Sequence, residues 1–90
     1  MTGRLILSMA GHDKGQYYLV IKEEKDILLL SDGRTRGILK PKKKNRKHVQ
    51  PCEQLFTAAD VEAFLKNPAW ADNMIREKVD QINKKNRKEA

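Results

Sequence analysis

Residues 27–39 read ILLLSDGRTRGIL, and this stretch holds the strongest local fold signal of the chain. The apolar run Ile27–Ser31 is long enough for a β-strand, and a second extended stretch, Arg34–Leu39, follows it. Between them, the pair Asp32-Gly33 is favoured in two-residue hairpin turns, because both central positions of such a turn need a positive φ. The stretch therefore predicts a β-hairpin.

Other short extended stretches surround this hairpin. Before it, Arg4–Met9 is mostly apolar, and Tyr17–Lys22 is rich in aromatic and β-branched residues. Residues 23–26 are a charged turn, Pro41 is expected to end the regular pairing, and a last short strand is expected at Lys47–Gln50. Five short strands joined by tight turns predict a small barrel, which closes to avoid open sheet edges.

From Phe56 onward the sequence has helical periodicity. Thr57 is a good N-cap and forms a capping-box signature with Asp60, while Phe56 and Val61 have the spacing of a hydrophobic staple. The helix is expected to end at Asn67, because the residue before a proline is disfavoured in the α region. Its apolar stripe consists of Ala58, Val61, Phe64 and Leu65.

Pro68 suits the first position of a second helix, with Asn67 as its cap. Its apolar stripe consists of Ala71, Ile75, Val79 and Ile82, with Trp70 and Met74 beside it. We expect this stripe to pack on the barrel, which needs the burial, although a stripe of this kind also suits a partner protein. The last turns are expected to be frayed, or ordered only on a partner, and contain four basic residues: Lys84, Lys85, Arg87 and Lys88.

The positive charge is concentrated in one segment. The chain has 90 residues and a net charge of +7, and residues 34–48 contain eight basic and no acidic residues. Such a segment suits a polyanion, because each Lys or Arg that meets a phosphate releases condensed counterions. The alternative is a solvated charge run that only confers solubility, or a disordered tail. The position inside the chain, between the apolar residues Leu39 and Val49, favours a basic surface held at one place on the fold.

The composition argues against several classes of protein. With 34% charged residues, no apolar run approaches the ~20 residues of a membrane span. The apolar stretch near the start is too short for a signal peptide, so a cytoplasmic location is expected. A single cysteine, Cys52, cannot form an internal disulfide and is expected to pack where the barrel meets the helices. A chain of this length leaves little room for an enclosed active site.

No arrangement of residues predicts catalysis or metal binding. His12, His48 and Cys52 are the only nitrogen or sulfur metal-ligand candidates, and they lack the paired spacing of zinc sites. Ser8, His12 and Asp13 resemble a catalytic set in composition, but the adjacent His12 and Asp13 side chains diverge in most loop conformations. Phosphate-binding glycine signatures are absent. We therefore expect no enzyme activity, no metal, no cofactor and no small-molecule substrate.

Aromatic residues are scarce, and strand alternation lets only one of Tyr17 and Tyr18 face outward. A protein that binds single strands generally presents several aromatic rings for bases to stack on. The sequence therefore favours recognition through phosphates and groove shape. A purely structural role for both tyrosines stays open.

The loop Ser8–Gly15 resembles a KOW motif, in which an apolar strand leads to a Lys-Gly pair and a second apolar strand follows. Leu5–Leu7 leads in, Lys14-Gly15 is the pair, and Leu19–Ile21 follows. KOW modules are SH3-like barrels that are common in ribosomal proteins and transcription factors and usually bind RNA. Many carry a further glycine after the pair, where this chain has Gln16-Tyr17-Tyr18.

A second resemblance narrows the family. The end of the basic run, Asn45–Pro51, is similar to a segment of the large-subunit ribosomal protein fourteen family of archaea and eukaryotes. Small bacterial relatives of that family share the loop seen at Ala10–Gly15, the pair Asp32-Gly33 and the stretch Lys40–Lys44. The resemblance covers Gly3–Pro51 and does not extend to the helical part.

Together these observations predict a mainly β fold with C-terminal helices, of class α+β. Residues 1–52 are expected to form an SH3-like five-stranded KOW barrel, and residues 53–90 a helical extension of two α-helices packed on it. The resemblance implies a non-enzymatic RNA-binding protein of the translation machinery. Its expected target is structured ribosomal RNA or a ribosome-associated complex, with ribosomal proteins as further partners.

The expected RNA-binding residues fall into two groups. His12 and Lys14 on the glycine-containing loop are expected to contact the RNA backbone or a groove edge. The basic segment supplies the expected phosphate contacts: Arg34, Arg36, Lys40, Lys42, Lys43, Lys44, Arg46 and Lys47. The alternative is a protein-interaction module that docks an acidic partner surface in the translation or transcription machinery. A membrane surface fits less well, because the basic segment lacks interleaved aromatic and leucine residues.

Overall fold

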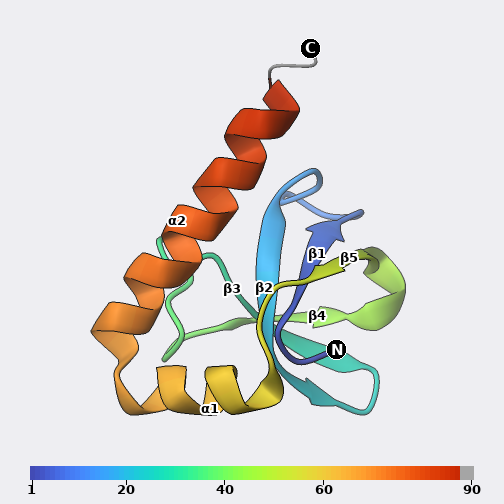
Figure 1. Ribbon diagram of the computed structural model, residues 1–90. Helices are drawn as coiled ribbons and strands as arrows, with labels where there is room; N and C mark the ends of the chain where they lie inside the picture. The colour runs from blue at the N-terminus through green and yellow to red at the C-terminus, as the bar shows by residue number, and fades with distance from the viewer. Residues whose placement is uncertain (88–90) are drawn as a thin grey trace.

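The structure, a computed structural model, describes residues 1–87 and has five β-strands followed by two α-helices (Figure 1). The strands are β1 (Arg4–Ser8), β2 (Tyr17–Glu24), β3 (Ile27–Ser31), β4 (Lys42–Asn45) and β5 (Val49–Gln54). A 3₁₀ turn, η1 (Arg46–His48), joins the last two strands, and the helices are α1 (Ala58–Lys66) and α2 (Pro68–Arg87). The expected α+β class, with strands first and helices last, is confirmed.

The strands form one antiparallel sheet in the order β4-β3-β2-β1-β5. β2 extends to Glu24, two residues beyond its expected end, and the tight turn into β3 has Lys25 at a φ of 55°. In β5, Pro51 lies opposite Ile6. Pro51 is tolerated there because β5 is an edge strand, where a missing N–H costs no ladder hydrogen bond.

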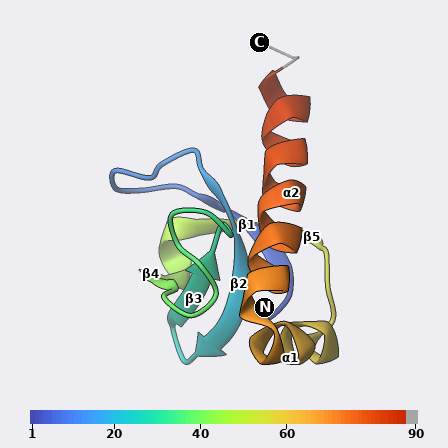
Figure 2. The same ribbon diagram turned by 90° about the vertical axis from the view of Figure 1, so that its left-hand side faces the viewer.

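The central strand β2 is buried on both faces. Tyr18 and Val20 join an inner cluster on one side, together with Ile6, Leu28, Leu30 and Val49. Leu19 and Ile21 join a helix-side cluster on the other side, together with Ile38, Val61, Phe64, Ala71, Ile75 and Val79. Figure 2 shows the helices along this second face. The helices therefore pack on the sheet through the apolar stripes that the sequence contains.

The sheet is strongly curved. Val49 of β5 shares the inner cluster with Leu28 and Leu30 of β3, although two strands separate β3 from β5 in the sheet. A register shift between Val20 and Lys22 marks a β-bulge in β2, and bulges bend a strand and increase its twist. β4 and β5 nevertheless remain the two edges, so the sheet is not closed. The small barrel expected from the sequence is not confirmed.

The predicted hairpin and its second strand at Arg34–Leu39 are wrong, because residues 32–41 form an irregular loop. The Asp32 carboxylate accepts hydrogen bonds from two backbone N–H groups of this loop, at 2.9 and 2.8 Å. The Asp72 carboxylate of α2 accepts a third, from the Ile38 N–H, at 2.8 Å. These carboxylates occupy N–H groups that a strand would offer to its neighbour.

The fourth strand lies later in the chain than expected. Pro41 does not end the pairing, because β4 begins directly after it and pairs with β3, with Lys42 opposite Leu30 and Lys44 opposite Leu28. The strand expected at Lys47–Gln50 is divided between η1 and β5. Lysine is disfavoured in strands, so the local sequence obscured β4. Two of its lysines have an ionic partner far away in the sequence, which is described below.

The predicted start and end of α1 and the predicted start of α2 are confirmed. Thr57 caps α1 through a complete capping box: its hydroxyl accepts from the Asp60 N–H at 3.0 Å, and the Asp60 carboxylate accepts from the Thr57 N–H at 3.0 Å. α1 is followed by Asn67, and α2 begins at Pro68. Local signals therefore determine where both helices start.

Some expected details of the helical part and of Cys52 differ. Leu65 and Trp70 are each 47% exposed, although Trp70 keeps an edge contact with Phe64 at a centroid distance of 5.4 Å. Cys52 lies half-buried in β5, outside both clusters, and its thiol donates to the Gln50 carbonyl oxygen at 3.6 Å. Three basic residues expected to be frayed are helical, and Lys88 lies outside the described residues: Lys84, Lys85 and Arg87 belong to α2.

Candidate nucleic-acid interface

Strand alternation divides the lysines of β4 between two faces. Lys42 and Lys44 lie opposite Leu30 and Leu28 of the inner cluster, and their side chains are only 28% and 10% exposed. Lys43 lies between them in the strand and is exposed. The run of three lysines therefore contains two structurally different kinds of cation.

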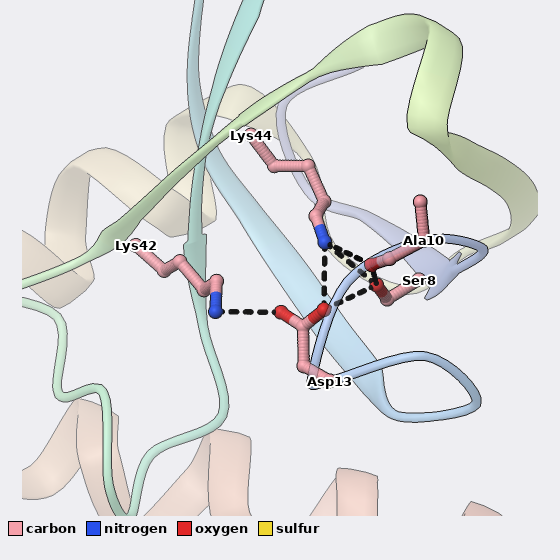
Figure 3. A network of polar contacts seen from close by, with 5 residues as sticks. All are labelled: Ser8, Ala10, Asp13, Lys42 and Lys44. Atoms are coloured by element: carbon pink, nitrogen blue, oxygen red, sulfur yellow. Dashed lines mark hydrogen bonds and ion pairs between the residues drawn. The ribbon is translucent and has the colours of Figure 1, made fainter.

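Lys42 and Lys44 converge on Asp13, in the connection between β1 and β2 (Figure 3). The Lys44 Nζ lies 2.6 Å from Asp13 Oδ1, and the Lys42 Nζ lies 2.8 Å from Asp13 Oδ2. The Ser8 hydroxyl donates to Asp13 Oδ1 at 2.7 Å, and Lys44 also donates to Ser8 Oγ at 2.9 Å. Lys44 donates further to the Ala10 carbonyl oxygen at 2.7 Å. We call these five residues the Asp13 cluster.

The Asp13 cluster holds a glycine loop, residues 9–16, against β4. Inside this loop the Gly15 N–H donates to the Ser8 carbonyl oxygen at 2.8 Å. Gly11 and Gly15 both have positive φ, 86° and 89°, a conformation that glycine adopts without a steric penalty. The loop is therefore tied at its base by backbone hydrogen bonds and near its middle by Asp13.

The charges of the cluster set the pKa of Asp13. Burial alone would raise this pKa, but hydrogen bonds from Lys42, Lys44 and Ser8, and the attraction of Lys44, outweigh burial and hold it well below its usual range. In the buried Tyr18, burial first and then the negative charge of Asp13 raise the pKa to about 12. Asp13 is thus ionised at neutral pH, and two ammonium groups share its one negative charge.

The three donors of the Lys44 ammonium group are all engaged inside the protein. An ammonium group has three N–H donors, and three oxygen acceptors lie within 2.9 Å of the Lys44 Nζ. Lys42 is less enclosed but points to the same carboxylate. Lys42 and Lys44, which the sequence predicted to contact phosphates, therefore hold the glycine loop in place through Asp13.

Two arginines of the predicted interface form surface ion pairs. Arg34 lies 2.7 Å from the carboxylate of Asp80 in α2, and Arg46 lies 2.9 Å from the carboxylate of Glu23 in β2. Both arginine side chains are largely exposed, at 62% and 45%. Exposed pairs of this kind contribute about 0–1 kcal/mol. Neither ion pair therefore contributes much to the stability of the fold.

The other predicted residues are exposed, and within residues 1–87 none of them takes part in an ion pair. The backbone N–H of Met9 donates to the His48 carbonyl oxygen at 2.9 Å, which places η1 beside the start of the glycine loop. His48 is itself exposed beside Lys47 and was not among the predicted residues. The exposed residues are His12 and Lys14 on the glycine loop, Arg36 and Lys40 in the 32–41 loop, Lys43 on β4 and Lys47 on η1.

The sequence shows Ser8 and Asp13 only as near neighbours of His12 in a loop. In the structure Ser8 and Asp13 contact each other and Lys44, whereas His12 is exposed. One signal pointed to Asp13, which is the single acidic residue among residues 1–22. Its partners lie 29 and 31 residues later in the chain, and no local pattern indicates that distance.

Within the part of the chain that the structure describes, no group of three or more His, Cys, Asp or Glu side chains could hold a metal ion. Neither α1 nor the described length of α2 has the apolar composition needed to cross a membrane. Comparison of the chain with protein-family models and with curated proteins gave no match.

Proposed function

We propose that this chain is a non-enzymatic RNA-binding protein whose exposed cations contact RNA phosphates. The observation that carries this proposal is the Asp13 cluster, which holds a loop bearing His12 and Lys14 beside the basic strand β4. Cations on a fixed backbone bind with a smaller loss of conformational freedom than cations on a mobile tail. A basic surface whose backbone is already fixed is therefore well suited to bind a structured polyanion.

The curved sheet supports the SH3-like KOW architecture that the sequence resemblance implies. η1 has three residues, so it brings the ends of the edge strands β4 and β5 close to each other. The Lys14-Gly15 pair of the KOW-like motif lies in the glycine loop, beside the basic strand. We therefore include in the proposal that the chain is an SH3-like KOW protein.

The aromatic residues support a structured RNA as the target. Tyr18 is 5% exposed, so its ring lies in the inner cluster and cannot stack on bases. Phosphate contacts position a protein on RNA without reading its sequence, so recognition here depends mainly on RNA shape. Structured ribosomal RNA in the cytoplasm, free or in a ribosome-associated complex, is the target we propose.

A salt titration of RNA affinity tests this proposal. The triple variant Lys14→Gln, Lys43→Gln, Lys47→Gln should keep its fold, because all three side chains are exposed. It should bind a structured RNA hairpin more weakly. Its plot of log affinity against log salt should be shallower by about 2–3 units, because each lost phosphate contact removes about 0.7–0.9 of a unit.

A matched control removes the same charge from the helices. In the control variant Lys66, Lys78 and Lys85, all exposed in α1 and α2, are replaced by Gln. Its salt slope should stay close to that of the wild type, and circular dichroism should report the same fold for all three proteins. Equal losses in both variants would mean that net charge, and not this surface, binds RNA.

Docking of an acidic protein by the same cations is the second candidate. It is favoured by the two exposed arginines, which already pair with the carboxylates of Asp80 and Glu23. The same titration separates the two functions. If the wild type shows no measurable affinity for structured RNA even at low salt, the acidic partner becomes the better account.

A further inference from the structure

A pocket opens beside the glycine loop, on the side where the sheet meets α2. Its volume is about 370 Å³, and it lies between the start of β2, the 32–41 loop and the C-terminal half of α2. Each of the three walls contributes a side chain: Tyr17 from β2, Thr35 from the 32–41 loop and Asn83 from α2. None of these three was assigned a role in phosphate binding.

The pocket combines an aromatic ring, an apolar side chain and polar groups. Tyr17 and Val79 line it, and Val79 is 6% exposed and belongs to the helix-side cluster. Asn83 and Thr35 offer side-chain donors and acceptors. The Arg34–Asp80 ion pair, at 2.7 Å, also lines the pocket, so a guanidinium and a carboxylate lie side by side there.

The loop wall of this pocket is preformed. Asp32 accepts two hydrogen bonds from the backbone of its own loop, from the N–H groups of Arg34 and Arg36. Gly33 is packed so closely on α2 that an added Cβ would lie 2.5 Å from the Arg76 nitrogen. The Ile38 N–H is bonded to Asp72 of α2. The loop carrying Arg34 and Thr35 is therefore held on the helix that forms the opposite wall.

We propose that this pocket holds one unstacked base of the bound RNA, an inference that rests on the proposed function. Unstacked bases in RNA loops and bulges are bound by stacking on aromatic rings or guanidinium planes and by hydrogen bonds to their edges. Tyr17 and Arg34 supply these two kinds of plane. The adjacent Asp80 carboxylate accepts hydrogen bonds from a base with an amino group, whereas uracil has no amino group to offer. The pocket thus suits guanine better than uracil, and Lys84 at its margin suits the attached phosphate.

Amide chemical-shift mapping with mononucleotides tests the pocket without any RNA. Guanosine monophosphate should shift the amides of Thr35, Val79 and Asn83 in a saturable manner, and uridine monophosphate should shift them more weakly. Inorganic phosphate alone should leave the Val79 amide in place. Absence of these shifts, while the wild type still binds structured RNA, would overturn the pocket and leave the proposed function standing.

A pocket-filling variant links the pocket to RNA. Asn83→Phe adds a ring inside it without a change of charge, and Gln81→Phe adds the same ring at an exposed position of the same helix. The wild type should prefer a hairpin with one bulged guanosine over the fully paired hairpin by about tenfold, the scale of one base–aromatic stack. Asn83→Phe should abolish this preference, and Gln81→Phe should retain it. An equal preference in both variants would overturn the proposal, and so would a chain that binds no RNA at all.

Discussion

Asp13→Asn is expected to lower the free energy of unfolding by about 3–5 kcal/mol, the scale for removing one partner of a buried ion pair. The substitution keeps the size of the side chain but removes the negative charge between Lys42 and Lys44. Lys44, whose side chain is 10% exposed, would then face Lys42 without a counter-charge. Small domains have a total stability of about 5–15 kcal/mol, so this loss is severe.

Urea denaturation of the wild type, Asp13→Asn and the control Asp26→Asn measures this effect. Asp26 is exposed at the β2–β3 turn and takes part in none of the ion pairs formed by the described side chains, residues 1–85, so its replacement should cost less than about 0.5 kcal/mol. If both variants unfold at the same urea concentration, the Asp13 cluster contributes nothing to stability and does not tether the loop.

The pH dependence of the free energy of unfolding provides a second test with the variant Asp13→Asn. The cluster holds the pKa of Asp13 below its ordinary value of 3.8, so its stabilising contribution is complete above that pH. As the pH falls further, toward the lowered pKa of the folded state, the carboxylate is protonated and the contribution is lost. The difference in stability between wild type and Asp13→Asn should therefore shrink below about pH 3.8. A difference that is constant through this range would contradict the ionic account.

Gly33→Val is expected to destabilise the chain by about 2–6 kcal/mol, through two costs that add. Gly33 has a φ of 73°, and a β-branched residue in that region costs about 1–3 kcal/mol. A Cβ at this position would also lie 2.5 Å from the Arg76 nitrogen and closer still to the Asp72 carbonyl oxygen. Both atoms belong to the backbone of α2, so the helix itself must shift, at a further cost of about 1–3 kcal/mol.

Gly15→Val is the matched control for this prediction. Gly15 has a φ of 89°, yet a Cβ there would meet no atom within 4 Å. Gly15→Val should therefore lower the free energy of unfolding only by the cost of the strained backbone, about 1–3 kcal/mol. Thermal or urea unfolding of both variants separates the two terms. A Gly33 variant that is no less stable than the Gly15 variant would show that the 32–41 loop is not packed on α2 as described.

The elements with local signals could be predicted from the sequence. The capping box at Thr57, the Asn67-Pro68 break between the helices and the apolar run of β3 all act within a few residues. The positive φ of Gly33 was also predictable. Its structural context was not, because the Asp32 carboxylate bonds to its own loop and replaces the pairing that a hairpin would need.

The fourth strand and the sorting of the lysines depend on contacts that are distant in sequence. Lys42 and Lys44 lie two residues apart, so they share one face of any strand. That face lies inside because β4 pairs with β3 and because Asp13 supplies the counter-charge, and both partners are distant in the sequence. The composition of residues 34–48 does not distinguish among the eight basic residues of the segment. The structure divides them into tethers, exposed ion pairs and exposed cations, and only the tertiary fold contains that distinction.

Lysine acetylation with and without a structured RNA, read by mass spectrometry, tests the central claim most directly. The claim is that the exposed cations bind RNA while Lys42 and Lys44 hold the glycine loop. In the free protein Lys14, Lys43 and Lys47 should react fast, and Lys44 should react slowly because its donors are engaged. RNA should protect the three fast lysines and leave Lys66 and Lys78 unchanged. Fast reaction of Lys44, or protection that falls on Lys66 and Lys78 instead, would contradict the account.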